Sequence, residues 1–159
     1  MHHDPEPPAS SDQPAFVRPA VEDHGRVVTA TIEAATFYRL AQRAVDPPGT
    51  IRALRLAIQA DPGFGLAIAD LDAISETRPS PIMGRQMNWE RHHIEVVRTA
   101  AAGNFSRAAD LLREQLASVG CDPLALRIVT DLRRRVGNPG GIEDLTSRLP
   151  DCHPACLWP

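Results

Sequence analysis

The chain has 159 residues and a mass of 17.3 kDa, which is enough for one domain with a sizeable core. Its net charge of −3 at pH 7 argues against general attraction to nucleic acid or to anionic membranes, because both require a basic surface. Aromatic residues make up only 4% of the sequence, and alanine, leucine, isoleucine and valine supply most of the apolar content. This balance favours helices that pack through small side chains, and it predicts an all-α fold.

The sequence contains no run of about 18 apolar residues that could cross a bilayer, and its first residues are polar and lack the apolar core of a signal peptide. We therefore expect a soluble, cytoplasmic protein that does not bind membranes. The three cysteines are Cys121, Cys152 and Cys156. An odd number of cysteines in a chain without a secretion signal indicates reduced thiols rather than a disulfide framework.

Three regions are expected from composition. Residues 1–25 are rich in proline and polar side chains, and they hold too little apolar surface to offset the entropy of ordering, so a disordered tail is predicted. A helical-repeat domain is predicted over 26–149, followed by an irregular tail over 150–159.

In the first half of the domain, apolar residues recur at helical spacing in three segments. We expect helices over 26–44, 50–60 and 64–75. The apolar stripe of the first consists of Val28, Ile32, Ala35, Leu40 and Ala44. Prolines separate the three helices, because Asp46-Pro47-Pro48-Gly49 stops the first and Pro62 stops the second.

The second half gives three more helices, over 87–102, 105–119 and 123–136, with a short helix over 142–148. Asp122 is the predicted N-cap of the third of these, and Pro123 takes its first helical position. Gly103-Asn104 breaks two apolar periodic runs, and Ala108 supplies the small residue that two antiparallel helices need where they approach closely. This pattern predicts antiparallel helix pairs stacked as a short tetratricopeptide-repeat (TPR)-like solenoid.

Four segments carry a family resemblance: Phe37-Tyr38, Ala57 to Phe64, Glu90 to Glu95, and Asp122 to Arg127. Together they resemble the tetratricopeptide-repeat protein 38-like family, over roughly residues 29–149. The chain is much shorter than that family and lacks its later repeats, so the resemblance is to the N-terminal part, and it implies a truncated solenoid. It implies no defined catalytic chemistry and supplies no active-site residues.

The expected function is a non-catalytic one, the mediation of protein–protein interaction with a protein or peptide partner. First helices of such pairs line the inner face of a solenoid, which makes their polar residues the candidate contacts. These are Tyr38, Arg39, Arg43, Arg91, Glu95 and Arg98. No cofactor is required. Homodimerisation is an alternative partner mode, because a truncated solenoid exposes an apolar end that the final short helix with Trp158 would cap either within the chain or in a second copy.

The densest polar cluster is Arg91, His92, His93 and Glu95. On one helix these side chains are close enough to pair, and pairing is favoured over partner contact or catalysis. A metal site would need more ligands, and no His-Glu-x-x-His motif, nucleophile elbow or glycine-rich phosphate loop accompanies the cluster. The chain is therefore not expected to be an enzyme.

The alternative function is a thiol-based metal-binding or redox-responsive regulator that uses the C-terminal cysteines. Cys121, Cys152, His153 and Cys156 form the ligand set of a Cys3His zinc site, although their spacing is not that of a zinc knuckle. The run Arg133 to Arg135 is better explained by the negative end of a helix dipole than by nucleic-acid binding. Core packing is the expected role of Phe37, Tyr38, Trp89 and Phe105.

Overall fold

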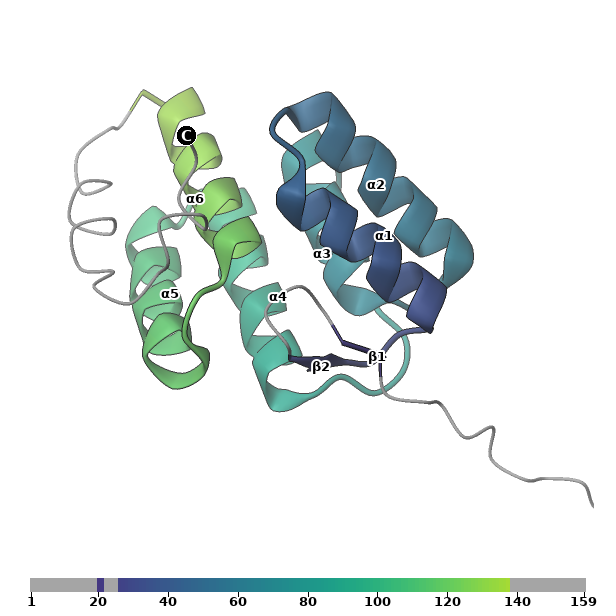
Figure 1. The fold of residues 1–159 in the computed structure, drawn as a ribbon. Coiled ribbons are helices and arrows are strands. Elements are labelled where there is room, and N and C mark those ends of the chain that lie inside the picture. Colours follow the sequence, from purple (N-terminus) through teal and green to yellow (C-terminus); the bar gives the residue numbers. More distant parts are fainter. Residues whose placement is uncertain (1–19, 22–25, 138–159) are drawn as a thin grey trace, which may run out of the picture.

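The structure is a computed structural model, and it describes residues 20–21 and 26–137. Those residues form a short antiparallel hairpin of β1 (Ala20–Val21) and β2 (Val27–Val28), followed by six helices (Figure 1). The helices are α1 (Ile32–Arg43), α2 (Pro47–Ala60), α3 (Gly65–Ser75), α4 (Asn88–Ala101), α5 (Phe105–Val119) and α6 (Pro123–Arg135). The predicted all-α class is confirmed. In this part of the chain, no helix has both the length and the apolar character that crossing a membrane would demand.

The first helix is shorter than predicted, because it begins at Ile32 rather than at residue 26. Its N-cap is Thr31, whose hydroxyl oxygen accepts a hydrogen bond from the backbone N–H of Ala34. Upstream backbone is held outside the helix, since Thr29 N–H donates to the Glu90 carboxylate and Val28 belongs to β2. Two strand residues, Ala20 and Val21, lie within the segment predicted as a disordered tail.

The second helix begins three residues earlier than predicted. Asp46 is its N-cap, and its carboxylate accepts a hydrogen bond from Gly49 N–H. Pro47 and Pro48 fit the first turn because the N–H groups that they lack would have no helical partner there. The proline segment therefore ends α1 and also starts α2.

The other four helices agree with the predicted ranges within one residue at either end. Asp122 is the N-cap of α6 as predicted, and its side chain accepts from Ala125 N–H over 3.2 Å. Gly103 has a φ of 84°, a left-handed conformation that glycine adopts readily, and it provides the turn between α4 and α5. The predicted helix over 142–148 and both predicted tails, except Ala20 and Val21, lie outside the described residues.

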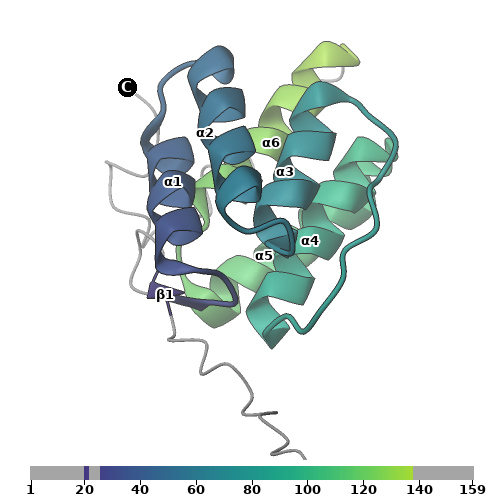
Figure 2. The ribbon, with the colours of Figure 1, turned by 90° about the vertical axis from the view of Figure 1, so that its right-hand side faces the viewer.

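The helices are not arranged only as a chain of sequential neighbours. The second helix, α2, packs on both α1 and α3, and α4 contacts α3, α5 and α6. The last helix, α6, returns to contact α1 as well as α3, α4 and α5. In Figure 2, α1 and α2 lie at one side of the molecule and α4 lies at the other, with α3 and α6 between them.

Small side chains form much of the core, as the composition predicts. Ala57 and Ala108 are fully buried at the helix contacts. The predicted apolar stripe of the first helix was wrong for Ile32 and Leu40, which are 58% and 52% exposed, because the core side of α1 carries Ala34, Tyr38 and Ala41 instead. Alanine at these positions allows α1 to approach its neighbours closely.

Candidate functional site

A buried polar network lies in the middle of the fold and is centred on His93 of α4. The imidazole lies between two carboxylates, with Nε2 2.7 Å from Asp70 Oδ1 and Nδ1 2.7 Å from Asp122 Oδ2. Asp70 comes from α3, and Asp122 stands at the start of α6. The network therefore joins three helices through one ring.

Two more helices join the network through neutral side chains. The hydroxyl of Tyr38 on α1 donates to Asp70 Oδ2 over 2.8 Å, and Gln115 Nε2 on α5 donates to Asp122 Oδ2 over 2.8 Å. With the hydrogen bond from Ala125 N–H, each carboxylate has at least two donors. Five of the six described helices are thus linked by hydrogen bonds to two buried acids.

The opposite charges of His93 and its carboxylate partners stabilise one another. Burial alone would lower the pKa of His93, but the negative charges of Asp122 and Asp70 and their hydrogen bonds raise it to about 10. Burial alone would raise the pKa of Asp122, but the charge and hydrogen bond of His93 hold it well below its ordinary value. Burial, together with the negative charges of Asp70 and Asp122, raises the pKa of Tyr38, so the phenol stays protonated and donates.

The side chains of this network are buried. All five of its side chains are at most 1% exposed. A reacting group has to touch its substrate, and within the described residues the hydrogen bonds of these side chains run to one another and to the backbone N–H of Ala125. We assign the network a structural role, in which it fixes the relative positions of the helices.

Sequence reasoning grouped His93 with Arg91, His92 and Glu95 as a polar cluster of pairing side chains and did not connect it with Asp70. One signal was present. Asp70 lies inside Leu66-Ala67-Ile68-Ala69-Asp70-Leu71, an almost continuous apolar run, and most of α3 is buried. A carboxylate in such a helix requires a buried partner, and histidine is one of the few side chains able to supply it.

Tyr38 was predicted as a partner contact, and the structure corrects this. Its side chain is 1% exposed, and its ring packs edge-on against Phe64 with centroids 5.1 Å apart. The other prediction for Tyr38, that its ring packs in the core, is confirmed. Phe37, Trp89 and Phe105 also pack partly buried against the core.

The other predicted contact residues fall into two groups. On α4, Arg91 and Glu95 are exposed, and the Arg91 guanidinium donates to Asn88 rather than pairing with Glu95. Arg98 is half-buried and donates to the carbonyl of Ser80, so it holds the loop between α3 and α4. His92, from the same predicted cluster, has Nε2 3.0 Å from the carbonyl of Leu111 on α5.

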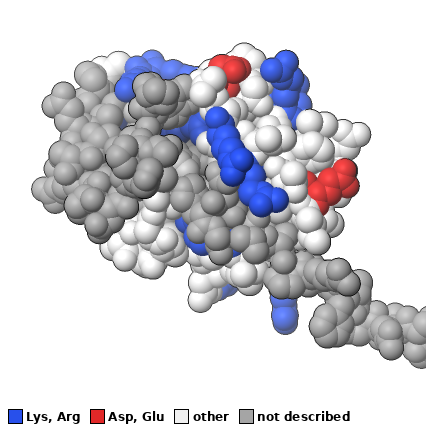
Figure 3. Space-filling view, in the orientation of Figure 1, with Lys and Arg blue, Asp and Glu red and all other residues white. Residues whose placement is uncertain are grey.

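The second group lies on α1, on the opposite side of the molecule from α4 (Figure 2). Arg39 is half-buried and donates to Thr36, and Arg43 is exposed. Basic side chains are visible over α1 in Figure 3, which is drawn in the orientation of Figure 1. The structure therefore does not bring the arginines of α1 and α4 together on one surface.

Apolar side chains accompany the arginines of α1. Ile32 is 58% exposed and Leu40 is 52% exposed, and at 100° per residue both lie on the same side of the helix as Arg39 and Arg43. We call Ile32, Arg39, Leu40 and Arg43 the α1 stripe. Arginine and exposed aliphatic side chains together are typical of protein interfaces.

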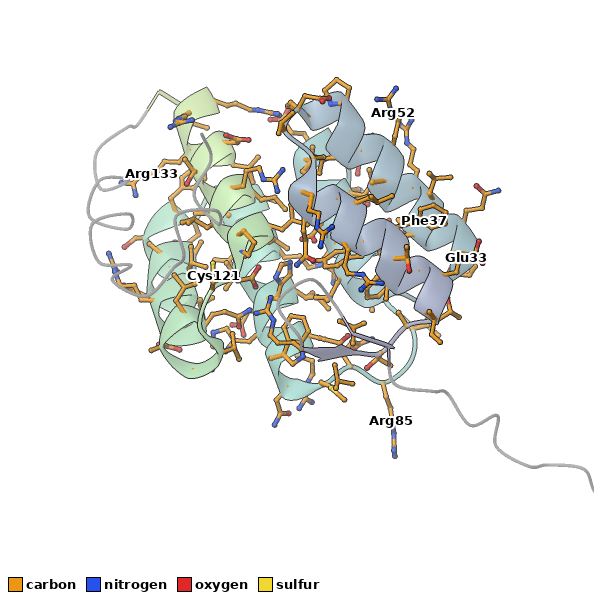
Figure 4. All side chains as sticks on the ribbon, in the orientation of Figure 1. Glu33, Phe37, Arg52, Arg85, Cys121 and Arg133 are labelled. Atoms are coloured by element: carbon orange, nitrogen blue, oxygen red, sulfur yellow. The ribbon has the colours of Figure 1, made fainter. Side chains whose placement is uncertain are left out.

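Cys121 is disulfide-bonded, so the prediction of reduced thiols was wrong for this residue. It is half-buried in the connection between α5 and α6, directly before Asp122 (Figure 4). Within the described residues, no group of three or more histidine, cysteine and acidic side chains is arranged to hold a metal ion. The other proposed zinc ligands, Cys152, His153 and Cys156, lie outside that part of the chain.

Two of the arginines at the end of α6 make ion pairs with acidic side chains. Arg135 Nη1 lies 3.2 Å from Glu76 Oε1, and Arg134 Nη1 lies 3.9 Å from Asp131 Oδ1. Arg133 to Arg135 form the last turn of the helix, where positive charge interacts favourably with the carbonyl end.

Comparison with known proteins found no matching family model, no matching curated protein and no matching solved structure. The resemblance to the tetratricopeptide-repeat protein 38-like family therefore stays a prediction from the residues.

Proposed function

We propose that this chain is a non-catalytic, TPR-like helical-repeat protein that mediates a protein–protein interaction through the α1 stripe. The observation that carries this proposal is the combination of two exposed aliphatic side chains, Ile32 and Leu40, with Arg39 and Arg43 on one side of an outer helix. Burying those aliphatic groups against a partner would remove apolar area from water, and the guanidinium groups would supply directional hydrogen bonds.

The packing supports a repeat-like architecture in which the last described helix, α6, returns to contact the first helix, α1. The hairpins α1–α2 and α4–α5 are adjacent antiparallel pairs with small residues at their contacts, as helical repeats require. Because α6 packs against α1, one side of α1 is covered by α6. We therefore assign the opposite, outer side of α1, which carries the α1 stripe, to the partner.

The partner surface should be acidic with apolar side chains. The described residues carry 15 arginines and no lysine against 12 acidic residues, and three of those acids, Asp70, Glu90 and Asp122, are buried. The surface of the described residues is consequently more basic than the net charge of the whole chain suggests. A carboxylate from the partner can form a bidentate pair with either arginine of the stripe.

The test is affinity capture with the full chain, compared with Arg39→Glu/Arg43→Glu. A matched control, Arg52→Glu/Arg55→Glu, makes the same charge change on exposed positions of α2. A partner that the wild type and the control retain and the α1 variant loses supports the proposal. Equal retention by all three proteins, each shown to be helical by circular dichroism, overturns it.

A second candidate function is a redox-responsive regulator. The observation that favours it over a metal-binding one is the disulfide at Cys121, because a sulfur in a disulfide is not a thiolate ligand. Mass spectrometry of the native protein distinguishes the two forms of this alternative. A zinc adduct on reduced thiols would contradict the redox form.

A further inference from the structure

We propose that the connection between α3 and α4 carries a second docking surface, which binds an acidic segment of a partner protein that also presents apolar side chains. We call the residues Met83, Arg85, Met87 and Arg91 the loop surface. None of them belongs to the α1 stripe, so the proposal goes beyond the proposed function and has its own test.

The connection projects from the fold at residues 83–85. Ile82 and Gln86, on either side of this tip, both lie against Gly65 of α3, since a Cβ at Gly65 would be 2.8 Å from Ile82 Cγ2 and 3.4 Å from Gln86 Cγ. All three residues of the tip are exposed. Gly84 has a φ of 97°, a left-handed conformation that glycine adopts readily. Because both ends of the tip contact the same glycine, the residues between them are held outward.

Hydrogen bonds fix the connection on both sides of the tip. Before it, the Asp72 carboxylate accepts from the backbone N–H of Ser80 over 2.7 Å and from its hydroxyl over 3.1 Å, and the guanidinium of Arg98 donates to the Ser80 carbonyl. After it, Met87 N–H donates to the Glu90 carboxylate over 2.7 Å. A loop that is already ordered loses little conformational entropy when a partner binds.

The apolar part of the loop surface consists of two methionines. Met83 is 74% exposed, and Met87 is 42% exposed. The flexible, polarisable side chain of methionine adapts to differently shaped apolar groups, and it is common at binding surfaces. The backbone N–H of Arg91 donates to the carbonyl of Met87, so a guanidinium lies one helical turn from the second methionine on the same side of α4.

The charge of this region is basic and lacks its own counter-charge. Figure 4 shows Arg85 pointing away from the fold, and within the described residues its guanidinium has neither a hydrogen bond nor an ion pair. Residues 77–89 contain no acidic side chain. Of the flanking acids, Glu76 lies 3.2 Å from Arg135, and Glu90 is buried. A partner carboxylate is therefore the complementary group, because it can form a bidentate pair with the guanidinium.

A protein segment fits the loop surface better than an anionic membrane does. Two arginines attract anionic lipids only weakly, since stable membrane binding takes a polybasic cluster or a lipid anchor in addition to apolar side chains. A peptide can place a carboxylate on each guanidinium and an aliphatic side chain on each methionine. We therefore assign an acidic, apolar protein segment to this surface.

The methionines themselves report on binding. The sequence has three, and two of them belong to the loop surface. The full chain, isotope-labelled at its methionine methyl groups, is titrated with an octapeptide of alternating glutamate and leucine and followed by NMR. We expect the signals of Met83 and Met87 to shift and that of Met1 to stay in place. The same peptide with lysine instead of glutamate, or with serine instead of leucine, should shift none of them.

Charge-reversal variants test the arginines by fluorescence polarisation of the labelled octapeptide. Arg85→Glu/Arg91→Glu should weaken binding at least about tenfold, because two attractive contacts become repulsive. The matched control is Arg52→Glu/Arg55→Glu, which makes the same change at exposed positions of α2 and should bind like the wild type. Circular dichroism verifies that both variants are helical.

Substitutions at the tip test the apolar contact. Met83→Ser should weaken binding of the octapeptide several-fold, and Met83→Leu should preserve it, because leucine keeps the apolar side chain. Leu56→Ser removes an apolar side chain that is 42% exposed on α2, and it should have no effect.

The outcomes separate this proposal from the proposed function. No shift of Met83 and Met87 with the acidic octapeptide, or shifts only with phosphatidylserine vesicles, overturns the loop surface. Loss of the octapeptide by Arg39→Glu/Arg43→Glu but not by Arg85→Glu/Arg91→Glu would place the site on the α1 stripe, which also overturns it and leaves the proposed function standing. If the loop variants lose the octapeptide while partner capture is independent of Arg39 and Arg43, the loop surface holds and the proposed function fails.

Discussion

At the scale of single residues, the feature that needs explaining is a charged imidazole in the core. Taking an ion out of water costs several kcal/mol, and a buried ion pair is stable only where further hydrogen bonds satisfy both partners. His93 meets this condition because each ring nitrogen has its own carboxylate at 2.7 Å. The two acids outnumber the imidazolium, and the positive charge of Arg26 also lowers the pKa of Asp122.

Tyr38→Phe should destabilise the protein by about 1.5–3 kcal/mol, because it removes a hydrogen bond to the buried carboxylate of Asp70 and leaves the ring in place. Urea unfolding followed by circular dichroism measures the change. Glu33→Gln, an exposed position on the same helix, should shift the free energy of unfolding by less than about 0.5 kcal/mol. A Tyr38→Phe protein as stable as the wild type would show that Asp70 does not depend on the phenol.

Sequence patterns identified individual residues where the reason was local. Asp122 followed by Pro123 predicted an N-cap, and Ala108 predicted a close helix contact, since both depend on neighbours in the chain. The pairing of His93 with Asp70 and Asp122 spans 23 and 29 residues of sequence. No local rule relates such positions, so the same reasoning grouped His93 with its neighbours in sequence, Arg91, His92 and Glu95.

At the scale of elements, a second buried acid sets where α1 begins. Glu90 of α4 is 1% exposed and accepts from the backbone N–H and the hydroxyl of Thr29 as well as from Met87 N–H. Through these bonds the N-terminus of α4 fixes the segment that enters α1. Hydrophobic periodicity predicted that the first helix starts at residue 26. A periodic pattern carries no information about a hydrogen bond between two residues that lie 61 positions apart, such as the one from Thr29 to Glu90.

Glu90→Gln should cost about 1.5–3 kcal/mol of stability. The carboxamide has one acceptor oxygen, so at least one of the three donors would face an amide N–H₂ group. Glu95→Gln makes the same chemical change on an exposed position of the same helix and is expected to be nearly neutral. Equal unfolding midpoints for the two variants in urea would contradict this role of Glu90.

Arg127 stabilises the other end of α1 from a distance. Its guanidinium donates to the carbonyls of Ala44 and Gln42 over 2.7 and 2.9 Å, which are groups that a helix end leaves without intrahelical partners. Arg127→Met should therefore increase amide exchange at the C-terminal turn of α1, with a loss of about 1.5–3 kcal/mol in global stability. Arg134→Met, at an exposed position of the same helix, is the control. Unchanged exchange in α1 would mean that the cap is not needed.

At the scale of the whole molecule, the polar network makes the helices interdependent. A linear solenoid is stabilised by contacts between neighbouring repeats. In this protein, hydrogen bonds of two buried acids, Asp70 and Asp122, link five helices: α1, α3, α4, α5 and α6. The fold class was predictable because alanine-rich helical periodicity is repeated along the chain. The return of α6 to α1 was not, since it depends on Arg127 and on the network, which are long-range contacts.

The network also makes global stability depend on pH. The pKa of His93 is raised from its ordinary value of 6.5 to about 10, so between these values the folded protein binds a proton that the unfolded chain has released. Stability should be fully present below pH 6.5 and should fall as the pH rises toward 10. Asp122 acts in the opposite direction: its pKa is lowered from 3.8, so its contribution is present above that value and is lost as the pH falls.

These two shifts together predict a maximum of the free energy of unfolding between pH 3.8 and 6.5. Urea unfolding at a series of pH values from 3 to about 10 measures the curve. His93→Gln should lose about 3–5 kcal/mol at pH 6, because it leaves two buried carboxylates without their cation, and its stability should not decline above pH 6.5 as that of the wild type does. Should this variant fail to fold, the wild-type curve alone decides, since a free energy that is level or rising between pH 6.5 and 10 would mean that His93 is neutral in the folded core.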